Sequence, residues 1–319
     1  MSEARKGRRF AVGFALVLAA ALVYPHVAPA YLVTLLAEIM VWALLAASLD
    51  VIFGYTGLLS LGHSAFFGLG MYAVVFWVMR SGMDALSGLA VAMVLCVAAG
   101  WLIGLFAVRF GSHYFIVITA TLALIAFFLA MSWREYTGGD DGLSVNVTLP
   151  WTGGRYSLLT PLPGYHFALG VTAVVFLATR WLVRSPIGRV FVAVRENEAR
   201  AELIGYDIHR YKVLAFATSA ALAGLAGGLY ACIHGYASAN YFHWSFSARA
   251  VLHAAVGGLG TLYGSILGAG ILISVEDLLS AKLLGTYPLI VGGILIAIML
   301  VAPRGLIGMC RAALSGRER

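Results

Sequence analysis

Long apolar segments alternate with short polar ones along the whole chain. A helix needs about 20 apolar residues to cross the hydrocarbon core of a bilayer. Segments of this kind predict ten spans, at residues 10–28, 31–53, 58–79, 85–108, 114–132, 166–183, 212–232, 241–257, 261–279 and 287–302. A single span at 250–273 is the alternative to the eighth and ninth. The runs are continuous rather than alternating as in barrel strands, so the pattern predicts an all-α polytopic membrane protein.

Composition agrees with this class. Of the 319 residues, 61% are hydrophobic and only 11% are charged, whereas soluble domains carry about 25% charged residues. This excludes a soluble enzyme, a disordered chain and a secreted disulfide scaffold. The three cysteines are expected to be buried thiols rather than a disulfide or metal site. No stretch predicts an extramembrane domain, so residues 1–319 are expected to form a single transmembrane domain.

The net charge of +7 is best explained by basic residues on cytoplasmic flanks, which orient helices in a bilayer. We therefore expect no nucleic-acid partner. Ten spans with both termini in the cytoplasm place most Lys and Arg inside, whereas nine spans divide them almost evenly. Ten spans are favoured. They place residues 133–165 outside and residues 184–211 inside.

The first segment has two interpretations. Residues 5–9 are basic, an apolar stretch follows, and Ala28-Pro29-Ala30 resembles a signal-peptide cleavage site. We expect a retained span, because the apolar stretch is as long as signal peptides allow. Sequencing the mature N-terminus distinguishes the two interpretations, since a chain that starts at Tyr31 would show that the first span is removed.

Glycines indicate where helices pack and where they break. Gly260, Gly264 and Gly268 are spaced by four residues, as are Gly100 and Gly104, and such small residues allow helices to approach closely in lipid. The Gly-rich runs 54–70 and 257–270 are the places where helices would break most easily. Interrupted helices in the two halves often mark a transport path.

Ionisable residues inside spans are candidate functional groups; here they are Glu38, Asp50, His63, Arg249, His253, Glu276 and Asp277. Interfacial placement explains Asp50, Glu276 and Asp277. Arg249 and His253 are one helical turn apart. They either face a path that attracts carboxylates, or Arg249 marks the outer interface; the sequence leaves both open.

Two loops carry recognisable patterns. Residues 195–204 predict one short helix that ends before Gly205, which is either a surface connection or a docking helix. Residues 137–144 (TGGDDGLS) are interpreted as a turn rather than a Ca²⁺ loop, because they lack the ligand series of an EF-hand.

Catalytic motifs are absent from the sequence. It contains no phosphate-binding G-x-x-x-x-G-K-[ST] loop, no H-E-x-x-H and no G-x-S-x-G. We therefore expect the chain not to be an enzyme and to bind no cofactor or metal. If ATP drives transport, another polypeptide hydrolyses it.

Four ordered motifs resemble those of the branched-chain amino acid ABC importer permeases of the LivM type. They are residues 54–68 (GYTGLLSLGHSAFFG), 137–144, 188–205 (GRVFVAVRENEARAELIG) and 257–264 (GGLGTLYG). The resemblance covers roughly residues 35–305. It implies a large-type ABC importer permease fold with about ten spans in a bacterial inner membrane.

The resemblance also implies partners and site residues. The partners are a homologous second permease, a periplasmic substrate-binding protein and two cytoplasmic ATPase subunits that carry ATP and Mg²⁺. A coupling loop that docks on the ATPase would include Arg195, Glu196, Glu198, Ala199, Glu202 and Gly205. A translocation path would include Gly57, Ser60, His63, Arg249, His253, Gly257, Gly260 and Gly264.

Departures from the family pattern leave the resemblance to the family intact but bear on the expected substrate. Asn is usual at the position of Asp50 and Pro at that of Ser265, and Arg249 and His253 are atypical. Leucine, isoleucine and valine are the leading substrates, with urea, short amides and other carboxylates as alternatives. The hypothesis from another class is a solitary carrier or channel, in which Glu38, Asp50 and His63 relay protons or bind an ion.

Overall fold

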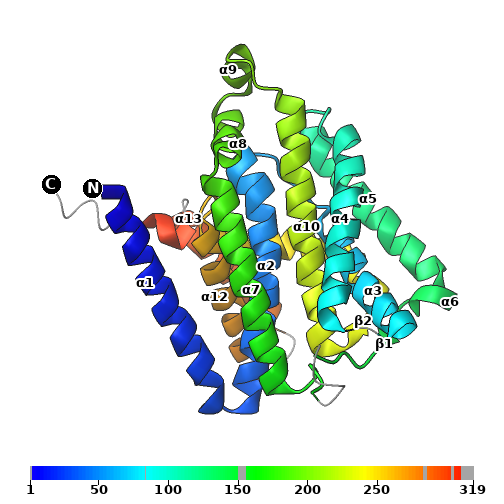
Figure 1. Ribbon diagram of the computed structural model, residues 1–319. Helices are drawn as coiled ribbons and strands as arrows, with labels where there is room; N and C mark the ends of the chain where they lie inside the picture. Colours follow the sequence, from blue (N-terminus) through cyan, green and yellow to red (C-terminus); the bar gives the residue numbers. More distant parts are fainter. Residues whose placement is uncertain (1, 83, 150–155, 283–285, 303–304, 310–319) are drawn as a thin grey trace.

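The computed structural model describes the chain except residues 1, 83, 150–155, 283–285, 303–304 and 310–319 (Figure 1). The described part is a bundle of long helices, which confirms the all-α class. Its helices are α1 (Ser2–Val23), α2 (Ala30–Leu49), α3 (His63–Ser81), α4 (Ala85–Ala107), α5 (Ser112–Ser132), α6 (Arg134–Thr137), α7 (Pro161–Arg184), α8 (Pro186–Glu196), α9 (Glu198–Leu203), α10 (Ile208–His234), α11 (Trp244–Gly257), α12 (Leu262–Ser280) and α13 (Tyr287–Val301).

Shorter elements connect these helices. They are the 3-10 turns η1 (Tyr24–His26) and η3 (Ala239–Phe242), the π-helical turn η2 (Asp50–Gly54), and the strands β1 (Leu143–Ser144) and β2 (Tyr236–Ala237). The two strands pair antiparallel, with Leu143 opposite Ala237 and Ser144 opposite Tyr236.

Within the described residues, seven helical segments are long and apolar enough to cross a membrane. They are α2 with η2, α3, α4, α5, α7, α10 and α12. Helices α1, α11 and α13 occupy the remaining predicted positions, but α11 has 14 residues and α13 has 15. At about 1.5 Å per residue, both are shorter than a hydrocarbon core of about 30 Å. The count of ten spans therefore stays a prediction.

Both predicted helix breaks are present. Residues 57–62 are not helical, and α3 begins only at His63, later than the expected residue 58. Residues 258–261 separate α11 from α12, so the alternative of one span at 250–273 is wrong. Gly57, Gly258 and Gly260 have positive φ angles of 78°, 119° and 74°. Glycine adopts this backbone region without the steric penalty of other residues, which explains why the chain breaks there.

Three expected boundaries are also corrected by local geometry. The span expected at 241–257 begins at Trp244, because residues 239–242 form the 3-10 turn η3. Helix α7 begins at Pro161 rather than near residue 166, since proline suits the first turn of a helix. Helix α1 ends at Val23 instead of residue 28, where a 3-10 turn with Pro25 follows.

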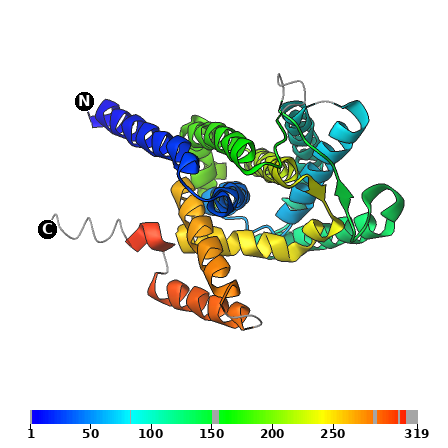
Figure 2. The same ribbon diagram turned by 90° about the horizontal axis from the view of Figure 1, so that it is seen from below.

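Helices α2 and α10 form the centre of the bundle and contact each other (Figure 2). The share of the apolar stretch buried inside the protein is 78% for α10 and 61% for α2 with η2, against 22% for α5. Small residues make this centre compact: a side chain at Gly227 would overlap the backbone of Phe67 in α3, and one at Gly224 would overlap Cys96 in α4.

The helix contacts are arranged symmetrically. Helix α2 packs on α11 and α12, as α10 packs on α3 and α4. Contacts between α3, α4 and α5 have counterparts between α11, α12 and α13. Since α2 and α10 start at opposite ends of the bundle (Figure 1), the segments α2–α5 and α10–α13 form two inverted halves.

The predicted small-residue packing is confirmed, with one change. Side chains at Gly100 and Gly104 would meet α10 at Ala220 and Phe216. A side chain at Gly268 would overlap the carbonyl of His253, so α11 and α12 are also in close backbone contact. Gly260, expected on the same helix face, lies instead in the turn before α12.

The two patterned loops lie at opposite ends of the bundle (Figure 1). Helix α9 extends beyond one end, called here the α9 end, while α8 contacts α7 and α10 at that end; the paired strands lie toward the other, the β1–β2 end. Helix α1 packs on α7, where the rings of Phe14 and Phe176 are stacked and the Tyr165 hydroxyl donates to the Ala21 carbonyl at 2.9 Å. Retention of α1 in the mature protein stays a prediction.

We expect Gly264→Leu to lower the thermal stability of the protein. A Cβ at Gly264 would lie 2.6 Å from the Gly258 carbonyl oxygen, and overpacking of this kind costs about 1–3 kcal/mol. Thermal unfolding of the purified protein measures the effect. Gly170→Leu is the matched control, because Gly170 is an exposed glycine of α7 with no atom within 4 Å of a Cβ. Equal melting temperatures for the two variants would contradict the packing argument.

Candidate functional site

The two helix breaks meet at the α9 end of the bundle. A Cβ at Gly54 would lie 2.5 Å from the Gly260 nitrogen and would overlap the Asp50 carboxylate. The Gly260 amide donates to Asp50 Oδ1 at 2.6 Å. We call Gly54, Gly57, Gly258 and Gly260 the glycine junction. The two breaks are thus one site, although some 200 residues separate them in the sequence.

Asp50 lies beneath the glycine junction, at the start of the π-helical turn η2. Its side chain is fully buried, and Oδ2 has no hydrogen-bond partner within the described structure. A buried charge without compensation is strongly unfavourable. The expected interfacial position of Asp50 is wrong, because its side chain lies inside the protein in contact with a backbone break.

Arg195 crosses the glycine junction from the other side. Its Nη1 donates to the Gly54 carbonyl, and the guanidinium interacts electrostatically with Asp50. Cβ atoms at Gly57 and Gly260 would lie 3.3 Å from Arg195 Cγ and 3.0 Å from Arg195 Nη1. The resemblance placed Arg195 on a docking surface; the residue is exposed, as expected there, but its guanidinium contacts the helix breaks.

The expected single helix at 195–204 is wrong, because the segment is divided at Asn197. Helix α8 ends at Glu196, Asn197 is extended, and its side chain accepts from the Arg200 amide at 2.9 Å as the N-cap of α9. Asparagine is a preferred N-cap, so the sequence contained this signal. Gly205 follows α9 with a φ of 99°, which confirms the expected helix end.

Helix α9 is anchored through Glu198. Its carboxylate lies 2.7 Å from the ammonium of Lys212, whose side chain is only 10% exposed. No local sequence signal indicates this pair, because Lys212 belongs to the next long helix. Glu196, Ala199 and Glu202 are exposed, as are Leu203 (88%) and Ile204 (71%) at the tip. The loop is therefore anchored to α10 at Glu198 and exposes apolar side chains at its tip.

Ser60 and His63 are buried beside the first break. The Ser60 hydroxyl accepts from the Gly62 amide at 3.2 Å, and His63 Nε2 lies 2.5 Å from the Ser219 hydroxyl of α10. Both side chains are fully buried. They support the break and its contact with α10; their place on a translocation path stays a prediction.

The other predicted path residues do not form one cluster with these. Gly257 and Gly264 pack against each other next to the glycine junction. Arg249 instead pairs with Glu276 of α12 and lies 6.0 Å from the Trp42 ring. His253 is buried edge-on against the same ring. The spacing of Arg249 and His253 thus puts both side chains against the Trp42 ring, where Arg249 is half exposed and His253 is buried.

Three acidic residues of the membrane segments have aromatic or basic partners. Trp42 donates to Glu38 at 3.2 Å, and the Tyr31 hydroxyl donates to Asp277. With Glu276 on Arg249, these contacts join α2, α11 and α12. Glu38, Asp50 and His63 therefore have separate hydrogen-bond partners. No metal-binding group of three or more His, Cys, Asp or Glu occurs in the described part of the chain.

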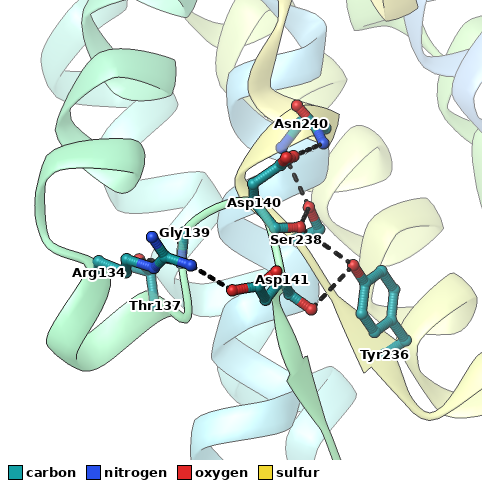
Figure 3. Close-up of polar contacts among 8 residues, drawn as sticks. All are labelled: Arg134, Thr137, Gly139, Asp140, Asp141, Tyr236, Ser238 and Asn240. Atoms are coloured by element: carbon teal, nitrogen blue, oxygen red, sulfur yellow. Dashed lines mark hydrogen bonds and ion pairs between the residues drawn. The ribbon is translucent and has the colours of Figure 1, made fainter.

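The loop 137–144 is locked to the segment after α10 (Figure 3). Asp140 accepts from the Asn240 side chain through its carboxylate and from the Ser238 hydroxyl through its carbonyl, the latter at 3.3 Å, whereas Asp141 pairs with Arg134. Both carboxylates thus have protein partners. The turn predicted from the sequence is confirmed, and its strand β1 pairs with β2. We call this contact the loop clasp.

We expect Asp140→Ala to loosen the loop clasp and Asp141→Ala to leave it nearly unchanged. Asp140 loses its hydrogen bond to Asn240, worth about 1 kcal/mol. The Arg134–Asp141 pair is highly exposed (70% and 77%), and such pairs contribute about 0–1 kcal/mol. Hydrogen exchange of residues 139–145 measures the difference, with an increase of about fivefold expected for Asp140→Ala. Equal exchange in the two variants would contradict this assignment.

Comparison with known proteins identifies the family. The model described as "Branched-chain amino acid transport system / permease component" matches residues 31–302. LivM of Escherichia coli K12, a high-affinity branched-chain amino acid transport system permease protein, is 29% identical over 298 residues, covering 86% of this chain and 69% of LivM. LivH of the same strain is 27% identical over 289 residues, covering 84% of this chain and 91% of LivH.

A more distant match is to LsrC of Klebsiella pneumoniae, an autoinducer 2 import system permease protein. It is 32% identical over 162 residues, covering 45% of this chain and 46% of LsrC. The family model covers most of the chain, including the glycine junction, the α8–α9 loop and the loop clasp. The protein therefore belongs to the family of branched-chain amino acid transport system permease components.

Proposed function

We propose that this protein is the permease subunit of an ATP-driven importer that moves branched-chain amino acids across a bacterial inner membrane by alternating access. Family membership together with the α8–α9 loop carries the proposal. The loop extends beyond the bundle (Figure 1) and exposes Leu203 and Ile204 at its tip. Exposed apolar residues at the end of an anchored helix favour a protein partner.

The partners follow from what the chain lacks and from its relatives. Without a phosphate-binding loop, it requires ATPase subunits, two in the assembled importer, which bind ATP and Mg²⁺ and contact the α8–α9 loop from the cytoplasm. LivM and LivH are both permease proteins of a high-affinity branched-chain amino acid transport system, which supports pairing with a homologous second permease. A periplasmic binding protein delivers the substrate.

Mild affinity purification from native membranes, with mass spectrometry of bound proteins, tests the assembly. We expect a second permease and ATPase subunits to co-purify. The binding protein, when recovered, is then screened with leucine, isoleucine and valine against urea, short amides and other carboxylates. A stable single subunit that transports without ATP would contradict the proposal and favour the solitary carrier.

We expect Glu198→Lys and Gly205→Val each to reduce uptake by about tenfold or more while the protein stays in the membrane. The first substitution places two ammonium groups together at Lys212, and the second forces a β-branched residue into a φ of 99°. ATP-dependent uptake, with the amount of protein in the membrane as reference, measures both.

Two further variants serve as a control for the glycine substitution and as a second test of the Glu198–Lys212 pair. Gly111→Val is the control for Gly205→Val, because Gly111 has a φ of −60° and no atom within 4 Å of a Cβ. Lys212→Met removes the anchor of α9 but keeps Glu198. We expect it to impair uptake as Glu198→Lys does. Normal uptake in both Glu198→Lys and Gly205→Val would count against ATPase docking at this loop.

A further inference from the structure

We propose that Arg195 is the positioning residue through which movement of the α8–α9 loop opens or closes the glycine junction. The inference deepens the proposed function and rests on it, since it requires a partner that moves the loop. Its starting point is that one side chain of the loop contacts both helix breaks: it donates to the Gly54 carbonyl, and its Nη1 faces Gly260.

Helices α8 and α9 are held together by a small apolar cluster. Val190, Val194 and Ala201 form an apolar cluster of their own, which Ile208 and Tyr211 at the start of α10 cover. The Glu198–Lys212 pair ties α9 to the same helix. Because α8 and α9 share this cluster, movement of α9 is transmitted to α8 and therefore to Arg195, in the last turn of α8; Phe191, earlier in α8, is buried in the main core and holds the start of that helix in place.

The contact with the glycine junction is electrostatic as well as steric. Asp50 is fully buried, holds the Gly260 amide with one oxygen, and leaves the other oxygen without a hydrogen-bond partner within the described residues. The charge that interacts with it is that of Arg195. Withdrawal of Arg195 therefore removes the hydrogen bond to the Gly54 carbonyl and takes a positive charge away from the buried Asp50 side chain, which weakens the contact between the two breaks.

Glycine at these positions makes the arrangement reversible. Any side chain at Gly57 or Gly260 would meet Arg195, and one at Gly54 would overlap the Asp50 carboxylate. With bare backbone on both sides, the guanidinium approaches and leaves the junction without obstruction. The two breaks come from opposite halves of the inverted repeat, so their separation changes the contact between the halves at the α9 end.

The test uses the whole complex in proteoliposomes, with uptake and ATP hydrolysis measured separately. We expect Arg195→Gln to lower uptake by about tenfold or more while ATP hydrolysis stays within about twofold of wild type. Arg109→Gln is the matched control, because Arg109 is an exposed arginine near the α9 end and outside the loop. Parallel loss of hydrolysis and uptake, or no change in either, would overturn the proposal.

A second substitution separates positioning from folding. Asn at position 50 keeps an acceptor for the Gly260 amide but removes the buried charge. We expect the double variant Asp50→Asn/Arg195→Gln to regain about threefold or more uptake over Arg195→Gln alone. If the loss of uptake in the double variant equals the sum of the losses in the two single variants, expressed as free energies, the electrostatic link is overturned. If Arg195→Gln does not fold, Arg195→Lys tests the geometry instead. Lysine keeps the charge but lacks the guanidinium that faces both Gly54 and Gly260. We expect less uptake per ATP hydrolysed, and wild-type coupling would overturn the proposal.

Thiol labelling makes the outcome independent of the partner proteins. Leu259→Cys, in a chain without its natural cysteines, reports access to the turn of the glycine junction. We expect Arg195→Gln to increase its labelling by a membrane-impermeant maleimide about fivefold or more. Unchanged labelling would overturn the inference. Absence of ATP-dependent uptake in the wild-type complex would instead overturn the proposed function, whatever the labelling result.

Discussion

The hydrocarbon core of a bilayer offers no hydrogen-bond partner to a peptide group, and the architecture follows from this constraint. Regular helices satisfy it along most of the chain. At residues 57–62 and 258–261, side chains replace backbone carbonyls as hydrogen-bond acceptors. Thr119 accepts from the Leu61 amide at 3.1 Å, Ser60 from the Gly62 amide and Asp50 from the Gly260 amide. The irregular backbone of both breaks is therefore paired with polar side chains, although the breaks lie at the α9 end of the bundle and Gly57 is exposed.

The same constraint determines where charges lie. Arg249 and Glu276 pair on α11 and α12, with side chains 48% and 24% exposed. Ionised groups at membrane depth require water or protein around them rather than lipid tails. The face that α11 and α12 present beside α2 is thus unsuited to lipid contact. Such a face suits a water-lined surface or contact with the second permease proposed above.

Sequence reasoning located elements better than contacts. Hydropathy predicted helices at all ten positions, and the glycine runs predicted both breaks, because these properties are local. The meeting of Gly54 with Gly260, and of Arg195 with both, depends on how distant helices pack, and no local pattern encodes it. Asn197 is different: its capping preference was present in the sequence, but the charge alternation around it favoured one continuous helix. The pairing of Glu198 with Lys212 also required the fold.

The loop clasp has a consequence for biosynthesis. Its first part, residues 137–144, precedes α7, and its second part, residues 236–240, follows α10. The ribosome must therefore deliver α7, the α8–α9 loop and α10 before β1 has a strand to pair with. Until then the Gly-Asp loop is an unpaired segment at the membrane surface, and its closure marks the moment at which the halves of the permease become joined on that side.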